Sequence, residues 1–150
     1  MLFPSSASYN FYYSHNTKAH FQVRDYLETQ LKENFGDQVH FNGKFCGKSE
    51  RIPNTCNVSI KGKGLEGRRV LAATKHLNAS VGAACHSGNV SCASPILLAI
   101  GIPHHIAINA LRLSIGRETT INDVDVVVRD LKQAIDLLQH ENGELEYNLH

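Results

Sequence analysis

The sequence has almost no net charge, no long apolar run and no secretory signal. Its 15 Lys and Arg residues and 14 Asp and Glu residues give a formal net charge of +1. Electrostatics therefore gives no reason to expect a nucleic acid or an anionic membrane as a partner. No apolar stretch approaches the ~20 residues that a membrane-spanning helix needs. Residues 1–13 lack the basic start and continuous apolar core of a secretory signal. These absences predict one cytoplasmic domain, for which 150 residues is an ordinary length.

Cysteine is also scarce, which argues against a disulfide scaffold. The four cysteines are spread unevenly along a chain with no export signal, and we expect reduced thiols in the cytosol. They are Cys46, Cys56, Cys85 and Cys92. The Cys and His residues around Cys85 lack the paired spacing of a zinc site, so no metal site is expected.

Apolar side chains that repeat every four residues predict a first helix over residues 19–36. The repeating side chains are Val23, Leu27, Leu31 and Phe35. Gly36 is a suitable end for this helix. Residues 1–18 show no such period, and we expect a loose arm or a non-native leader there.

The last helix is marked by a cap and a long apolar stripe. Thr120 to Asp123 resembles a capping box, and apolar residues recur over about five turns beyond it. The stripe consists of Ile121, Val124, Val128, Leu131, Ile135 and Leu138. A helix is therefore predicted to begin at Ile121, and the polar tail, residues 142–150, is expected to fray.

Between these helices, residues 55–60 form the clearest strand, because apolar and polar side chains alternate. Cys56 lies on the apolar side and is expected to serve packing, whereas Asn57 and Ser59 face the other way. The other expected strands cover residues 38–42, 80–84 and 111–115, and the other expected helices cover residues 65–77, 95–100 and 103–110. This order predicts an α+β domain over residues 19–141, with a small, mostly antiparallel sheet covered by helices.

Cys85 is the best candidate for covalent chemistry. A run of small residues, 80–84, leads to it, and small or polar residues follow it. A thiol in such a loop has the access that a nucleophile needs. The alternative is that Cys85 is a small buried side chain at the end of a strand.

Arg112 is the best candidate for binding an anionic group. It is a lone guanidinium in the apolar strand 111–115, where it shares the polar side with Ser114. A planar, always charged fork is well suited to binding a carboxylate through two hydrogen bonds. The alternative is a surface arginine or a structural ion pair.

Three motifs resemble the C-terminal part of the selenocysteine lyase family. They lie in Pro53–Ile60, Ser80–Ser87 and Asn109–Thr120, and the likeness covers residues 19–140 in order. This family is grouped with the cysteine desulfurases in the class V aminotransferases, which are fold type I enzymes dependent on pyridoxal phosphate. The sequence Ala-Ala-Cys-His-Ser, residues 83–87, favours the selenocysteine branch.

The resemblance implies a mechanism and a homodimeric enzyme. The substrate would form a Schiff base with the cofactor, which acts as an electron sink. Cys85 would be the thiol that meets the departing selenium, Arg112 would hold the substrate carboxylate, and the products would be alanine and reduced selenium. No stretch of the chain matches the family's cofactor lysine, its acidic partner or its phosphate cradle, so the isolated chain is expected to be an inactive fragment. A cysteine desulfurase fragment and a non-catalytic small domain that binds a partner remain as alternatives.

Overall fold

The computed structural model describes residues 6–44, 51–81 and 92–147, with side chains described for residues 17–44, 51–81 and 92–143. In chain order the elements are α1 (Ser6–Phe35), the 3-10 helix η1 (Gly36–Gln38), β1 (Val39–Phe41), β2 (Thr55–Ile60), α2 (Gly67–Ala73), β3 (Ser80–Val81), α3 (Pro95–Ala99), α4 (His104–Ala107), β4 (Ala110–Ser114) and α5 (Ile121–Tyr147). Each strand lies within one residue of, or inside, a segment for which the sequence predicts a strand.

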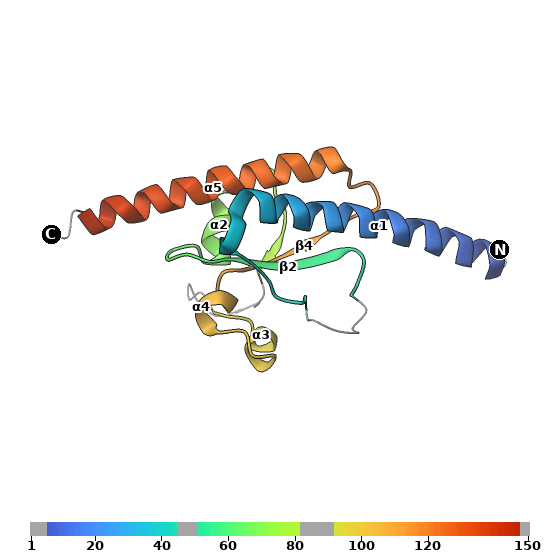
Figure 1. Ribbon diagram of the computed structural model, residues 1–150, viewed down its shortest axis with the longest axis horizontal. Coiled ribbons are helices and arrows are strands. Elements are labelled where there is room, and N and C mark those ends of the chain that lie inside the picture. Colours follow the sequence, from blue (N-terminus) through green and yellow to red (C-terminus); the bar gives the residue numbers. More distant parts are fainter. Residues whose placement is uncertain (1–5, 45–50, 82–91, 148–150) are drawn as a thin grey trace.

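The strands form one antiparallel sheet in the order β1-β2-β4-β3. Two long helices, α1 and α5, run along one face of this sheet and pack against each other, whereas α3 and α4 lie on the other side (Figure 1). The predicted α+β class, with a small antiparallel sheet covered by helices, is confirmed.

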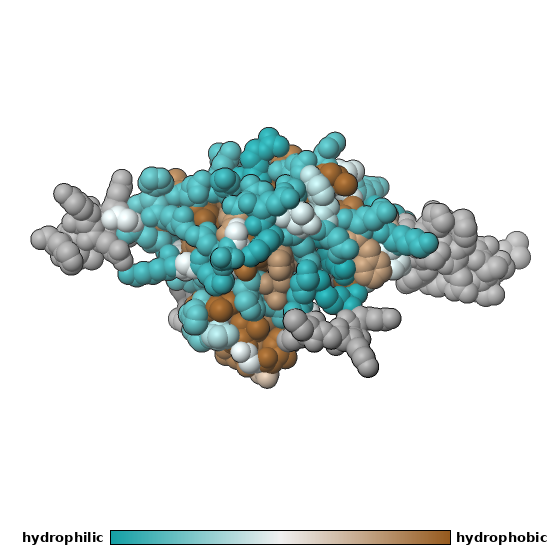
Figure 2. All heavy atoms as spheres, in the orientation of Figure 1, coloured by the Kyte–Doolittle hydropathy of each residue, from teal (hydrophilic) through white to brown (hydrophobic). Residues whose placement is uncertain are grey.

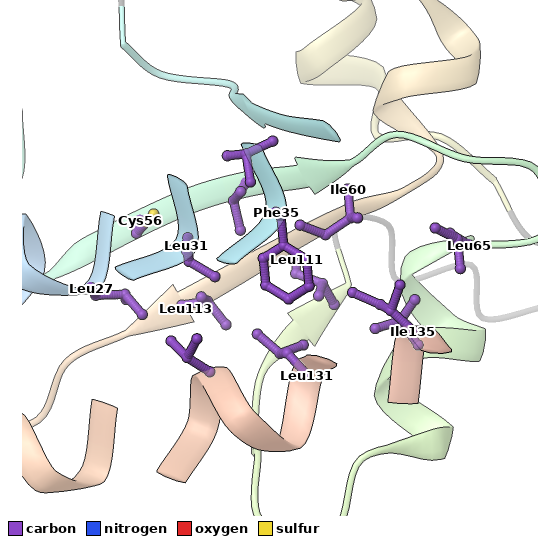
Figure 3. Packing of buried hydrophobic residues seen from close by; sticks show 14 of the residues in the cluster. Leu27, Leu31, Phe35, Cys56, Ile60, Leu65, Leu111, Leu113, Leu131 and Ile135 are labelled. Carbon is purple, nitrogen blue, oxygen red and sulfur yellow. The ribbon is translucent and has the colours of Figure 1, made fainter. Parts of the chain in front are cut away.

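The main core lies between the sheet and the two long helices. Leu27, Leu31 and Phe35 of α1 point toward the strands, and Leu131 and Ile135 approach from α5 (Figure 3). Each fully buried apolar side chain of this size contributes about 1.5–3 kcal/mol to folding. The predicted stripes of both helices are confirmed, except that Ile121 at the start of α5 is 46% exposed.

Both long helices extend further than the sequence predicts. Helix α1 begins at Ser6, within the segment expected to be a loose arm or a leader. Helix α5 ends at Tyr147, within the segment expected to fray. Adding a residue to an existing helix costs far less than nucleating one, so a packed helix can continue without an apolar stripe of its own.

The helix predicted over residues 65–77 is shorter, because its two ends are bound elsewhere. The Gly67 amide donates to the carbonyl of Ile108 at 3.1 Å, and a Cβ on Gly67 would lie 2.4 Å from the carbonyl oxygen of Ala110. Helix α2 therefore begins at a glycine that lets two backbone segments meet. The helix predicted over residues 103–110 is also shorter, since Ala110 already belongs to β4.

Two of the predicted helix boundaries are confirmed in their hydrogen bonds. The Thr120 amide donates to Asp123 Oδ2 at 2.8 Å, and the Asp123 amide donates to Thr120 Oγ1 at 3.2 Å, which is a reciprocal capping box at the start of α5. At the end of α3, Gly101 has a φ of +87° and its amide donates to the carbonyl of Leu98. Glycine adopts this left-handed conformation at little cost.

A buried carboxylate on α1 holds the connection between β1 and β2. Glu28 is 6% exposed and accepts hydrogen bonds from Arg51 and Lys44. Burial raises the pKa of Glu28, but the hydrogen bonds and charges of Arg51 and Lys44 outweigh burial and bring it below its usual value. Arg24 also reaches this connection and donates to the carbonyl of Ile52 at 3.1 Å.

A second buried carboxylate, Asp130 on α5, holds the segment that leads into β3. Asp130 is 5% exposed, and its oxygens accept the backbone N–H groups of Lys75, His76 and Leu77 at 2.6–3.2 Å. Burial raises the pKa of Asp130, but these hydrogen bonds outweigh it and leave the pKa below its usual value. The carboxylate therefore fixes the turn between α2 and β3.

We expect Asp130→Asn to lower the free energy of unfolding by about 2 kcal/mol at neutral pH, since hydrogen bonds to a charged acceptor are lost. Because the pKa is lower in the folded state, the stabilisation is fully present above about pH 4, the unfolded value. It is lost as the pH falls through the folded pKa. Urea unfolding between pH 3 and pH 7 measures both effects. Asp136→Asn, at an exposed position of α5, is the control, and an equal loss in both variants would contradict the role of Asp130.

Candidate functional site

The sheet has a polar face opposite the main core. Strand alternation sends Val58 of β2 and Leu111 of β4 into the core and sends the residues next to them in each strand to the other side. The polar face carries His40 and Asn42 from the β1 segment, Asn57 and Ser59 from β2, Arg112 and Ser114 from β4, and Ser80 from β3.

Arg112 lies in the middle of this face. Its cross-strand neighbours are Asn57 on β2 and Ser80 on β3, and its side chain is exposed. Within the described part of the chain, the guanidinium makes no hydrogen bond or ion pair. The prediction that Arg112 and Ser114 share the side away from the core is confirmed. Of the two alternatives for Arg112, a structural ion pair has no partner among the described residues, whereas a surface arginine agrees with the exposure of the side chain.

A buried amide orders the polar face next to Arg112. Asn42 is 2% exposed, and its Nδ2 donates to both Asn57 Oδ1 and Ser59 Oγ at 2.8 Å. Asn42 Oδ1 lies 2.8 Å from His40 Nδ1. Because an amide oxygen only accepts hydrogen bonds, Nδ1 of His40 carries the proton. The side chains of the β1 and β2 segments therefore form one connected network.

Cys85 lies outside the described residues, so its position stays a prediction. Cys56, by contrast, is fully buried in the main core, as the strand pattern predicts. Burial raises the pKa of the Cys56 thiol to about 12, which keeps it protonated and inert at neutral pH. Cys56 is therefore a packing residue of the main core and does not act as a nucleophile.

The α3–α4 region presents an apolar surface. Pro95 is the first residue of α3, as predicted, whereas Ser94 stands at the cap position without a side-chain capping bond. A small cluster that includes Leu97 and Ala107 holds the region together. Figure 2 shows hydrophobic residues gathered there, and Ile96 is 74% exposed.

The described residues offer no metal site and no membrane span. No group of three or more His, Cys, Asp or Glu side chains in residues 17–44, 51–81 and 92–143 is placed to hold a metal ion. None of the described helices combines the length and apolar character needed to cross a membrane.

The sequence did not single out Asn57 or Asn42 as functional residues. The alternation of residues 55–60 correctly places Asn57 on the polar side. Its position beside Arg112 depends on the pairing of β2 with β4, which one strand's pattern does not reveal. The only sequence signal was a pair of polar side chains, Asn57 and Ser59, in an otherwise apolar strand.

Sequence comparison finds close relatives, although no family model matches the chain. Selenocysteine lyase of Bos taurus is 55% identical over 117 residues, which are 78% of this chain and 26% of the bovine protein. The Homo sapiens enzyme is 53% identical over 120 residues, 79% of this chain and 27% of that protein. Cysteine desulfurase IscS of Methanosarcina thermophila is 34% identical over 103 residues, 69% of this chain and 24% of the relative. The chain thus spans about a quarter of the length of these relatives.

Solved structures share the fold. A NifS-like protein from Rickettsia africae ESF-5 superposes with a TM-score of 0.63 at 21% identity, over 82% of this chain and 30% of that one. A second NifS-like protein gives a TM-score of 0.59 at 22% identity, over 83% of this chain and 29% of that one. The fold is therefore that of part of a NifS-like protein. By sequence, this chain is homologous to a segment of the selenocysteine lyases, with the cysteine desulfurases as a related family.

Proposed function

We propose that this chain is the C-terminal small domain of a pyridoxal-phosphate-dependent selenocysteine lyase, which converts L-selenocysteine to L-alanine and reduced selenium. The observation that carries the proposal is the identity of 55% to a selenocysteine lyase, against 34% to a cysteine desulfurase. In this proposal the domain comprises residues 19–141, with residues 1–18 as a leader. The working enzyme would be a cytoplasmic homodimer.

Arg112 would bind the substrate carboxylate. It is exposed on the polar face, has no charged partner among the described residues, and projects from a strand held between two others. A guanidinium carried by a strand of the sheet can bind both carboxylate oxygens without first breaking an ion pair. Cys85, four residues beyond the end of β3 in the sequence, would be the thiol that meets the departing selenium.

The described residues do not fit the cofactor itself. Pyridoxal phosphate supplies an electron sink when it is bound through a lysine, and such a lysine is activated by desolvation or by a nearby cation. Every lysine that the structure describes is exposed. We therefore propose that the cofactor is held by another part of a longer polypeptide, and that this chain supplies the carboxylate site and the thiol.

Two other functions have some support. The identity to cysteine desulfurases favours a persulfide-forming enzyme with the same two residues. The exposed apolar side chains of α3, Ile96 and Leu98, favour a non-catalytic domain that binds a partner, because apolar groups gathered on a surface mark interaction sites. The experiments below separate these functions from selenocysteine cleavage.

The purified chain is expected not to retain pyridoxal phosphate, since its described lysines are solvated. One equivalent of cofactor, followed by gel filtration, should leave no borohydride-reducible band near roughly 420 nm. Bovine selenocysteine lyase treated in the same way is the positive control. A retained band in this chain would contradict the assignment of the cofactor lysine to another segment.

Cys85→Ser is expected to lower alanine release from L-selenocysteine by at least about a hundredfold, the scale of losing a proton-transferring group. The measurement uses a chimera in which this chain replaces the homologous 117-residue segment of the bovine enzyme. Cys92→Ser, another thiol seven positions further along, is the matched control. Undiminished turnover by Cys85→Ser would exclude Cys85 and favour the binding domain, whereas preference for L-cysteine would favour the desulfurase.

Arg112→Ala in the same chimera is expected to lower kcat/KM by roughly tenfold to a hundredfold, mainly through a higher KM, because the carboxylate loses two charge-assisted bonds. Arg112→Lys should recover part of this loss, since lysine keeps the charge but cannot bind both carboxylate oxygens through a planar group. Arg68→Ala, at an exposed position of α2, serves as the control. A kcat/KM unchanged by Arg112→Ala would remove the carboxylate role.

A further inference from the structure

Asn57 on β2 is a direct polar neighbour of Arg112 across the sheet, and Ser80 on β3 is the other. The two residues are paired directly in the register of β2 and β4, and side chains at such positions have Cβ atoms about 5 Å apart. Both lie on the polar face, opposite the buried Cys56, Val58, Leu111 and Leu113. The Arg112 and Asn57 side chains therefore leave the sheet from adjacent positions on the same face.

The Asn57 amide has one end occupied and the other available. Its Oδ1 accepts a hydrogen bond from Asn42 Nδ2 at 2.8 Å, so the amide oxygen is turned toward β1. In the strand order β1-β2-β4-β3, β1 and β4 flank β2 on opposite sides. Nδ2 of Asn57 is consequently turned away from Asn42, and none of the described residues accepts a hydrogen bond from it.

In the structure, the orientation of the Asn57 amide is matched to that of Asn42. Asn42 is buried, and both hydrogens of its Nδ2 are engaged, by Asn57 and by Ser59. Its oxygen is engaged by His40. An Asn42 amide turned the other way would bring its oxygen against Asn57 Oδ1, with no proton between them. The Asn57 donor is thus held in place before any ligand arrives, which lowers the entropy cost of binding.

We propose that Asn57 is a second carboxylate-binding residue beside Arg112, and that Asn42 is the positioning residue that aims it. The inference rests on the proposed function, which makes the ligand an α-amino carboxylate. A carboxylate has about four lone-pair sites. A bidentate guanidinium uses two of them, and the Asn57 Nδ2–H donates to a third. The pair recognises the carboxylate by charge and by geometry, and an uncharged carboxamide is rejected.

The test compares two ligands that differ only in this group, L-alanine and L-alaninamide. Each is titrated into the 15N-labelled 150-residue chain and followed by two-dimensional NMR. L-alanine shifts the side-chain amide signal of Asn57, which is assigned by its absence from the spectrum of Asn57→Ala. L-alaninamide leaves this signal in place. Once the signal is assigned, this measurement does not require any variant to bind the ligand.

The variant Asn57→Ala weakens L-alanine binding about tenfold, the scale of one charge-assisted hydrogen bond. Ser114→Ala, exposed on the same face of β4, leaves L-alanine binding unchanged.

The inference is overturned if L-alanine leaves the Asn57 signal unmoved, or if Asn57→Ala binds L-alanine as tightly as the unsubstituted chain. Such a result leaves the proposed function standing when the chimera still depends on Cys85 and Arg112. If Cys85→Ser and Arg112→Ala leave the turnover of the chimera unchanged while L-alanine still shifts the Asn57 signal, the chain has a carboxylate site that serves another reaction.

Discussion

The two-residue alternation of β2 and β4 determines where everything else in this domain lies. Cys56, Val58, Leu111 and Leu113 must be buried together under α1 and α5, and burial of such side chains is the main favourable term in folding. A shift of one residue in the register would bury Arg112 and expose the core residues. The position of the exposed guanidinium is therefore a consequence of core packing, although the guanidinium itself takes no part in the core.

Buried polar groups then fix the parts of the domain that the core does not reach. Asp130 binds the backbone before β3, Glu28 binds the connection between β1 and β2, and Asn42 joins β1 to β2. An unpaired polar group in such a place would cost the full desolvation penalty. Each group therefore favours a single arrangement of its loop, and together they hold β1 and β3 at the two edges of the sheet that carries Arg112.

The α3–α4 region differs from the rest of the domain because its helices are short and its cluster is small. Ile96, Leu98 and Ile100 remain exposed, whereas the apolar stripes of α1 and α5 are almost fully covered. The relatives that match this chain are about three times as long, so an apolar surface of this kind is compatible with packing against further protein.

The sequence by itself determined the strands, the long helices with their buried stripes, the capping box and the polar side of Arg112, because all of these depend on local period and local hydrogen bonds. It did not determine how far α1 and α5 continue, since helix propagation beyond a packed segment needs no apolar pattern. Only the tertiary structure paired Asn57 with Arg112 and connected Asn57 to Asn42. These contacts join strands far apart in the sequence, and their register is decided by which apolar side chains are buried together.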